Sequence, residues 1–275
     1  MPELPEVETT RRGLEPALER RVIARVLVRN PALRWPVPPE VALAAGQTVS
    51  GCRRRAKYLL IDLGDRNPAD NGLMIHLGMS GSLRICDSAD APRKHDHFDL
   101  VLDNGFCARF NDPRRFGALL WWRGEAENHQ LLRDLGPEPL TDDFTGEVLW
   151  RQSRNRKGSV KNFIMDGKIV VGVGNIYASE ALYMSGIHPA RQARRISAAR
   201  YEALAGAIRD VLARAIRSGG TTLRDYLNSA GRPGYFARDL LVYEREDQPC
   251  FQCATPIRRQ VIGQRSSYYC PRCQR

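Results

Sequence analysis

The sequence predicts an α+β fold that has a leading helix, a β-sandwich or barrel, a helical region and a C-terminal hairpin with four cysteines. Three observations predict it. Up to about residue 130, short alternating or apolar runs are separated by Gly, Asn, Asp and Pro, which is typical of an all-β region. Beyond that point apolar residues recur at helical spacing. Two Cys-x2-Cys pairs stand at the C-terminal end.

The leading helix is expected over residues 3–19. Pro5 falls in its first turn, where a missing backbone N–H costs least. Glu3, Glu6 and Glu8 place negative charge at the positive end of the helix dipole. The pattern therefore indicates a helix that begins almost at the first residue.

The runs that follow this helix have the length and composition of strands. They cover residues 21–29, 57–63, 73–79, 82–86, 97–102, 106–110 and 115–122. Many short strands after one helix are typical of a sandwich or a barrel.

The pattern becomes helical after a connector at residues 135–144, which is rich in proline and acidic residues. Helices are expected over 147–157, 159–166, 175–186 and 197–220. The last has one apolar face, made by Leu204, Ile208, Val211, Leu212 and Ile216, and ends at a Gly-Gly pair. We therefore expect a helix and β-sandwich at 1–130, a hinge or linker at 131–150, a helical domain at 151–240 and a cysteine finger at 241–275.

The chain carries 42 Lys and Arg residues against 31 Asp and Glu, a net charge of +11. This surplus suits a polyanionic partner, because basic side chains near phosphates release condensed counterions. No apolar stretch approaches the ~18 residues of a membrane span, and the N-terminus has no signal-peptide pattern. We expect a cytoplasmic protein with reduced thiols. Cys52, Cys86 and Cys107 are then small buried apolar residues.

The two Cys-x2-Cys pairs are separated by sixteen residues. Their thiols belong to Cys250, Cys253, Cys270 and Cys273. This spacing predicts one structural zinc ion in a closed tetrahedral site. Two disulfides are the alternative, but they conflict with a cytoplasmic location. The intervening residues 254–269 are expected to form a basic hairpin that includes Arg265.

Pro2 follows Met1, and a small second residue normally permits removal of the initiator methionine. The chain would then begin with a secondary amine. Attack of that amine on a sugar C1′ displaces a base and, after ring opening, leaves an iminium cation that acidifies the C2′ proton. Elimination of the 3′ phosphate follows, with Glu3 moving the protons. A disordered or capping N-terminus is the alternative reading of a Met-Pro start.

Peptides spread along the whole chain resemble one family. They are PELPEVE at 2–8, AKYLL at 56–60, HLGMSGSLR at 76–84, NDPRRFG at 111–117, GVGNIYASEAL at 172–182, GGTTLRD at 219–225, PGYF at 233–236 and the four-cysteine finger. In this order they closely resemble the formamidopyrimidine-DNA glycosylases, which excise oxidised purines and cleave abasic sites. The resemblance implies a β-sandwich with an N-terminal helix, a helical domain containing a helix–two-turn–helix motif, and a zinc-finger β-hairpin.

The resemblance also implies roles for individual residues. Pro2 would be the Schiff-base nucleophile and Glu3 the catalytic acid and base, with Glu6 supporting the helix end. Lys57 resembles the lysine that holds phosphates next to the lesion, and a solvated strand-end lysine is the alternative. Arg265 resembles the arginine of the second elimination step, and a plain phosphate contact is the alternative.

Further residues match positions that contact DNA in the family. Met79, Arg114 and Phe116 match the side chains that fill the gap left by a flipped nucleotide. Without the family, Met79 and Phe116 would be interpreted as ordinary core residues. His76 and Arg115 are expected to contact phosphate.

The helical region contributes two more matches. Lys161 resembles a lysine that contacts the base or the backbone, although Asn162 stands where relatives often have Pro. Asn175 opens a helix, where an N-cap role and a phosphate-binding role are compatible. Residues 219–236 resemble the glycine-rich loop that closes over the flipped purine, and roles for Thr222 or Tyr226 within it stay unassigned.

Three functions are weighed. We expect a monomeric glycosylase that acts on double-stranded DNA containing oxidised purines or abasic sites and cleaves by β,δ-elimination. An oxidised-pyrimidine enzyme of the endonuclease VIII type is disfavoured by the gap-filling set, because that branch fills the gap with other side chains. A catalytically silent DNA-binding protein is disfavoured because Pro2, Glu3 and Lys57 are all present.

Overall fold

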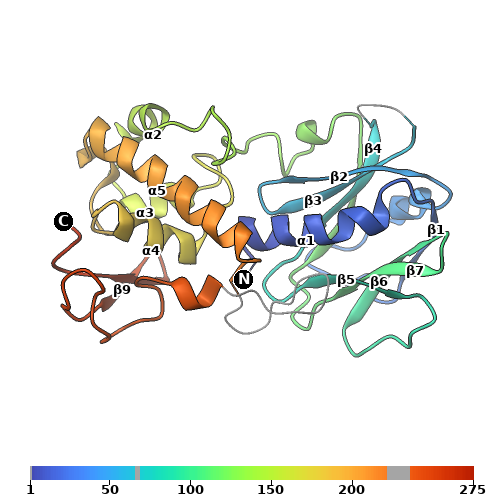
Figure 1. The fold of residues 1–275 in the computed structure, drawn as a ribbon. Coiled ribbons are helices and arrows are strands. Elements are labelled where there is room, and N and C mark those ends of the chain that lie inside the picture. Colours follow the sequence, from blue (N-terminus) through green and yellow to red (C-terminus); the bar gives the residue numbers. More distant parts are fainter. Residues whose placement is uncertain (1, 66–68, 222–235) are drawn as a thin grey trace. The chain divides into compact units, whose positions relative to one another are not determined.

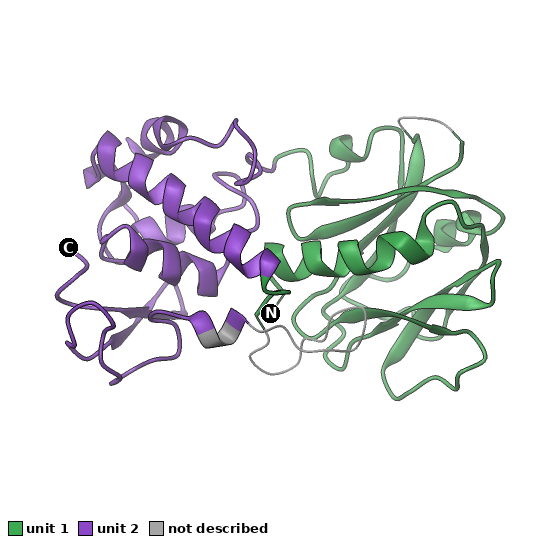
Figure 2. Cartoon of the chain, in the orientation of Figure 1, with its two compact units in different colours: residues 1–134, 218–235 green, residues 135–217, 236–275 purple. Residues whose placement is uncertain are grey.

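The computed structural model describes residues 2–65, 69–221 and 236–275. The chain forms two compact units, residues 1–134 with 218–235 and residues 135–217 with 236–275 (Figure 2). The domain boundaries that the sequence predicts at residues 130, 150 and 240 divide the chain more finely, and they stay a prediction. Within the described part of the chain, no helix is both long enough and apolar enough to cross a membrane.

The first unit begins with helix α1 (Leu4–Leu18), as the sequence predicts. Pro5 lies in its first turn, and the Glu6 carboxylate accepts a hydrogen bond from the backbone N–H of Glu3 at 2.7 Å. The Glu3 side chain in turn accepts from the backbone N–H of Glu6, and the two contacts form a capping box. The helix buries Leu14 and Leu18 and packs against strands of both sheets (Figure 1).

The strands of the first unit form two four-stranded antiparallel sheets. One sheet has the order β1 (Ile23–Val28), β6 (Asp96–Leu102), β7 (Phe106–Asn111) and β5 (Ser82–Asp87). The other has the order β2 (Val49–Arg55), β3 (Tyr58–Leu63), β4 (Asn71–His76) and β8 (Ala118–Arg123). A short 3-10 helix, η1 (Pro39–Ala44), lies between β1 and β2, and another, η2 (Ala126–Asn128), follows β8. Both sheets contribute to one apolar core, so the predicted sandwich is confirmed.

Strand β2 has no counterpart among the predicted strands. Its sequence ends in three arginines and lacks apolar alternation. In the fold these charges are paired: the Arg53 guanidinium lies 2.7 Å from the Asp62 carboxylate, and the Arg54 guanidinium lies 3.2 Å from that of Glu8. A carboxylate on the neighbouring strand β3 and another on helix α1 therefore stabilise a strand that local hydrophobicity does not indicate.

The second unit is helical, with a two-stranded hairpin near its end. Its elements are α2 (Gly146–Ser153), α3 (Val160–Met165), α4 (Asn175–Met184), η3 (Ala193–Arg195), α5 (Ala198–Arg217), η4 (Phe236–Asp239), β9 (Arg258–Ile262) and β10 (Arg265–Tyr269). Helix α5 buries its predicted apolar face and packs against α2 and α4 (Figure 1). Helix α2 is shorter than the predicted 147–157.

A buried carboxylate fastens α4 to the segment that enters the finger. The side chain of Glu180 accepts hydrogen bonds from the backbone N–H groups of Leu241, Val242 and Tyr243, at 2.7, 3.0 and 2.8 Å. Three donors satisfy the acceptor oxygens of this carboxyl group, which would otherwise be costly to bury, although burial still raises the pKa of Glu180 above its ordinary value. The residues before the finger are thereby held on a rigid helix.

A buried ion pair lies on the β1–β6–β7–β5 sheet. The guanidinium of Arg109 donates two hydrogen bonds of 2.9 Å to the Asp99 carboxylate, and Arg29 donates to the same group. Burial by itself raises the pKa of Asp99, but the hydrogen bonds from Arg29 and Arg109 bring it below its ordinary value. Asp99 is therefore ionised and neutralises a fully buried arginine.

We expect Asp99→Asn to lower the free energy of unfolding by about 3–5 kcal/mol, because the charge of Arg109 would remain buried without a counterion. Urea denaturation measures the change. The control is Glu147→Gln, which breaks an exposed ion pair with Arg151 and should change stability by less than about 0.5 kcal/mol. Equal losses of stability in the two variants would contradict the assignment of Asp99 and Arg109 as a buried ion pair.

Candidate functional site

The N-terminal residues singled out by the sequence lie at a fixed, buried helix start. Pro2, Glu3 and Glu6 are all buried. One oxygen of the Glu6 carboxylate accepts from the backbone N–H of Glu3, and the other accepts from the backbone N–H of Thr221, each at 2.7 Å. Glu6 thus joins the start of the chain to the start of the glycine-rich loop.

The glycine-rich loop 219–236 is described only at its two ends. Gly220 has a φ of 85° and lies so close to Glu6 that an added Cβ would be 3.1 Å from the carboxylate. A residue with a side chain would be strained there. Residues 222–235, including Thr222 and Tyr226, lie outside the described residues.

Pro2 and Glu3 together provide two chemical functions. The nitrogen of Pro2 becomes a free secondary amine when Met1 is removed, and a secondary amine is a nucleophile that forms a cationic iminium. The carboxyl group of the next residue can donate and accept protons. Because the helix start holds both residues, the Pro2 nitrogen and the Glu3 carboxyl group are positioned by the same structure.

Lys57 lies in the two-residue turn between β2 and β3, one residue before the strand it was expected to open. Ala56 in that turn has a φ of 54°, and its carbonyl accepts a hydrogen bond of 3.0 Å from Arg54. Arg54 also contacts Glu8 of α1. The turn that carries Lys57 is therefore anchored on the helix that carries Glu3.

Met79, Arg114 and Phe116 lie on two loops that contact each other. Gly78 has a φ of 67°, and a Cβ there would lie 2.4 Å from the carbonyl carbon of Phe116, so only glycine permits this approach. Met79 is 36 % exposed and Phe116 is 44 % exposed. The Arg114 guanidinium lies 4.9 Å from the centre of the Phe116 ring. Met79 and Phe116 are therefore surface residues here, not core residues.

Asp112, which the sequence analysis did not single out, organises these two loops. Its fully buried carboxylate accepts from the Ser80 hydroxyl at 2.6 Å, from the Gly117 N–H at 2.7 Å and from the Arg114 N–H at 3.2 Å. Its position before a proline is a turn-initiation signal that could have indicated it. The exposed side chains project from loops that share this buried anchor.

Arg115 and His76 flank the same loops. Arg115 is exposed and adopts a φ of 57°. The Nδ1 atom of His76 accepts a hydrogen bond of 3.0 Å from the Gly78 N–H, which leaves the proton on Nε2. Burial, followed by the charges of Arg34 and Lys57, lowers the pKa of His76 to about 4. His76 is thus a neutral donor near pH 7.

Lys161 and Asn175 meet in the second unit. The Lys161 ammonium donates to Asn175 Oδ1 and Ser267 Oγ, each at 2.6 Å, and to the Ser266 carbonyl at 3.0 Å. Asn175 is the first residue of α4, and Gly174 rather than Asn175 is the N-cap. Its amide donates to the Ser266 carbonyl at 3.1 Å. The buried lysine therefore holds the Asn175 amide against β10.

Arg265 is exposed at the start of β10, directly after the tight turn of Gly263 and Gln264. Both turn residues have a positive φ, of 56° and 63°, as a two-residue hairpin requires. A Cβ on Gly263 would lie 2.5 Å from the Asn162 side chain. The hairpin thus packs closely on α3 at the position where this chain departs from the family pattern.

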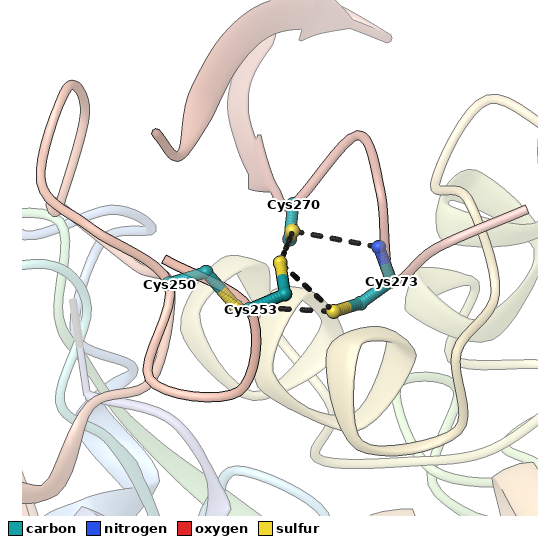
Figure 3. A group of neighbouring side chains, drawn as sticks. All are labelled: Cys250, Cys253, Cys270 and Cys273. Atoms are coloured by element: carbon teal, nitrogen blue, oxygen red, sulfur yellow. Dashed lines mark hydrogen bonds between the residues drawn. The ribbon is translucent and has the colours of Figure 1, made fainter. Parts of the chain in front are cut away.

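The four finger cysteines converge on one point (Figure 3). Their Sγ atoms all lie within 4.8 Å of one another, and three of the pairs are 3.9, 3.5 and 3.5 Å apart. Zinc–sulfur bonds of about 2.3 Å give a tetrahedron with sulfur atoms about 3.8 Å apart. None of the four forms a disulfide. The thiols fit the predicted structural zinc ion, which would complete a closed site.

We expect Asp112→Ala to lower the free energy of unfolding by about 2–3 kcal/mol, because two buried donors, the Ser80 hydroxyl and the Gly117 N–H, would lose their acceptor. Chemical denaturation measures this change. Asp87→Ala is the matched control, since exposed Asp87 accepts one N–H, from Ala89 at 2.8 Å, and its loss should cost less than about 0.5 kcal/mol. An unchanged Asp112→Ala protein would show that the carboxylate is not an anchor.

The lowered pKa of His76 predicts a specific acid sensitivity. The folded protein holds the neutral ring, so this contribution to stability is complete above pH 6.5 and is lost as the pH falls toward about 4. His76→Asn keeps an acceptor for the Gly78 N–H but cannot titrate. Between about pH 7 and about pH 5, it should lose less stability than the parent chain in urea unfolding. Parallel losses would contradict a neutral, buried His76.

Comparisons with known proteins cover the chain from end to end. Models of the formamidopyrimidine-DNA glycosylase N-terminal domain, of its H2TH domain and of a zinc finger found in FPG and IleRS match residues 1–119, 135–226 and 247–275. A formamidopyrimidine-DNA glycosylase of Syntrophotalea carbinolica is 60 % identical over 277 residues, covering all of both chains.

Solved structures agree with this similarity. The crystal structure of the MutM (Fpg) protein from Thermus thermophilus has a TM-score of 0.88 and 38 % identity, with 99 % of this chain and 98 % of that chain covered. A complex of Lactococcus lactis Fpg with abasic-site DNA has a TM-score of 0.90 and 29 % identity over the whole of both chains. The chain therefore belongs to the formamidopyrimidine-DNA glycosylase family.

Proposed function

We propose that this protein is a base-excision repair enzyme that removes oxidised purines from double-stranded DNA and then cleaves the strand at the resulting abasic site. The observation that carries the proposal is the buried helix start, where Glu6 fixes Glu3 directly beside the prospective amine of Pro2. The relatives are named formamidopyrimidine-DNA glycosylase, and a mutant of the Lactococcus lactis FPG has been solved in complex with DNA containing Fapy-dG. We place its action, as a monomer, in the cytoplasm.

The first chemical step is attack of the Pro2 amine on C1′ of the damaged nucleotide. The C1′–N bond to the base breaks, and the base leaves with its electron pair. The attacking nitrogen loses its N–H proton, which neutralises the departing base. Glu3 donates a proton to the sugar-ring oxygen as the ring opens, which gives an iminium cation between Pro2 and C1′. A secondary amine has no N–H to lose at this stage, so the cation persists.

The second step is strand cleavage. The iminium withdraws electrons from C2′, a base removes the C2′ proton, and the 3′ phosphate departs in β-elimination. Lys57 binds the phosphates beside the lesion, and Arg265 assists the second, δ-elimination. Support for these roles is positional: the Lys57 turn is anchored to α1, and Arg265 is exposed on the finger hairpin.

Flipping of the nucleotide leaves a gap in the DNA stack that must be filled. Met79 and Phe116 are exposed apolar side chains on loops tied by Asp112, and Arg114 lies over the Phe116 ring. We assign Met79 to the vacated space, Phe116 to a wedge position and Arg114 to the orphaned base. The shared anchor means that the three side chains enter DNA as one unit.

The remaining site residues bind the DNA backbone in this proposal. Arg115 supplies a positive charge, and His76 donates a neutral hydrogen bond from Nε2 to phosphate. In the second unit Lys161 orients the Asn175 amide at the start of α4, and the positive end of a helix dipole favours phosphate. The zinc finger also binds DNA. The zinc ion itself stabilises the folded finger and takes no part in the reaction.

We expect borohydride to trap a covalent complex between Pro2 and a duplex that contains 8-oxoguanine opposite cytosine. Reduction converts the iminium to a stable amine, and peptide mapping with intact mass locates the link and reports the loss of Met1. A variant with one glycine inserted before Pro2 is the control: it should bind DNA and zinc but give no trapped complex. A verified free Pro2 that excises damaged purines without any reducible link would contradict the mechanism.

An oxidised pyrimidine is the second candidate substrate, because a Lactococcus lactis relative has been solved with DNA containing an oxidised pyrimidine. Excision rates on 8-oxoguanine and thymine glycol duplexes, measured side by side, decide between the substrates. Faster excision of thymine glycol would favour the pyrimidine enzyme. Binding without excision of either would indicate a silent DNA-binding protein.

A further inference from the structure

Two cysteines that the proposed function does not use face each other across strands β5 and β7. Cys86 and Cys107 are direct register partners, and their Sγ atoms are 3.6 Å apart. Directly opposed residues in an antiparallel pair have Cα atoms about 4.5–5.5 Å apart, within the range that a disulfide spans. The sulfur atoms need to approach by only ~1.5 Å, which side-chain rotation can provide.

The two thiols differ in their access to solvent. Cys107 is fully buried, and Cys86 is half-buried. The cations of Arg84 and Arg109 stand two residues away along the same strands and are themselves register partners. Because side chains alternate along a strand, these arginines share the face of the cysteines. Each is already paired with a carboxylate, Arg84 with Asp96 and Arg109 with Asp99. Burial raises the pKa of Cys107 to about 12, so the half-buried Cys86 is the thiol that a peroxide reaches first.

The other cysteines lack this arrangement. Cys52 is buried and has Ile61 rather than a thiol as its cross-strand partner. The four finger thiols converge on the metal site. Among the described residues, Cys86 and Cys107 are thus the opposed thiols outside the finger.

We propose that Cys86 and Cys107 are a redox modification site, at which a hydroperoxide reversibly forms a cross-strand disulfide. The Cys86 thiolate attacks the peroxide oxygen, breaks the O–O bond and becomes a sulfenic acid, while the peroxide is reduced to an alcohol or water. The Cys107 sulfur then attacks the Cys86 sulfur and loses its proton. The sulfenic oxygen leaves with that proton and one more as water, and a small thiol can reverse the link.

The position of the link gives it a structural consequence. β5 is the edge strand of its sheet and is hydrogen-bonded to β7. It begins just after the turn that carries Met79, and β7 ends just before Asp112. A covalent link therefore fastens the strand pair from which both gap-filling loops emerge, under the oxidising conditions that also damage purines. The inference does not depend on the glycosylase assignment.

Peptide mapping tests the proposal. The zinc-loaded protein is treated with dilute hydrogen peroxide, alkylated without reduction and digested with trypsin. The sequence predicts that peptides 85–93 and 95–109 appear as one linked species, which dithiothreitol separates. Cys52→Ser should keep the link. Cys86→Ser and Cys107→Ser should abolish it, and Cys107→Ala replaces the latter if it does not fold.

Zinc content measured on the same samples separates this reaction from oxidation of the finger. Hydrogen exchange supplies a second readout: backbone amides of β5 should exchange more slowly after peroxide treatment in the parent chain and should not change in Cys86→Ser. Both thiols recovered as free, or Cys86 recovered as sulfinic acid beside a free Cys107 while the zinc is retained, would overturn the proposal.

Discussion

The buried carboxylate of Glu6 is the constraint on which the proposed chemistry depends. Its two oxygens accept hydrogen bonds from the backbone N–H groups of Glu3 and Thr221, which are far apart in the chain. A carboxylate excluded from water is costly unless donors surround it, so both segments must keep their places to satisfy it. The amine of Pro2 and the first residues of the glycine-rich loop are thereby held in one location without any contribution from ligand.

The same principle recurs elsewhere in both units. Asp112 holds the two exposed loops of the first unit, Glu180 holds the entry to the finger, and Lys161 holds the Asn175 amide. In each case a buried charged side chain binds backbone or side-chain groups from segments distant in sequence. Networks of this kind specify one arrangement, because a partly satisfied network is strongly disfavoured. Exposed functional side chains are then displayed on rigid supports rather than on flexible loops.

Much of the fold could be predicted from local pattern. The leading helix, seven of the eight strands in the first unit and the apolar face of α5 follow from periodicity and turn residues. Strand β2 was missed because its arginines become acceptable in a strand only when Asp62 and Glu8 lie opposite them. The strand predicted at 115–122 starts too early in the sequence. Arg115 has a left-handed backbone conformation, and β8 begins only at Ala118.

The sequence by itself determined the chemistry available to this protein: a proline and a glutamate at the chain start, four thiols in finger spacing, and a family resemblance along the whole length. Those features are local in the sequence, so they can be identified without the structure. The tertiary structure alone decided that Asp112 anchors two loops, that Lys161 is buried beside Asn175 and that Cys86 opposes Cys107. These facts depend on strand register and on packing between distant segments, where a shift of one residue reverses which side chains meet.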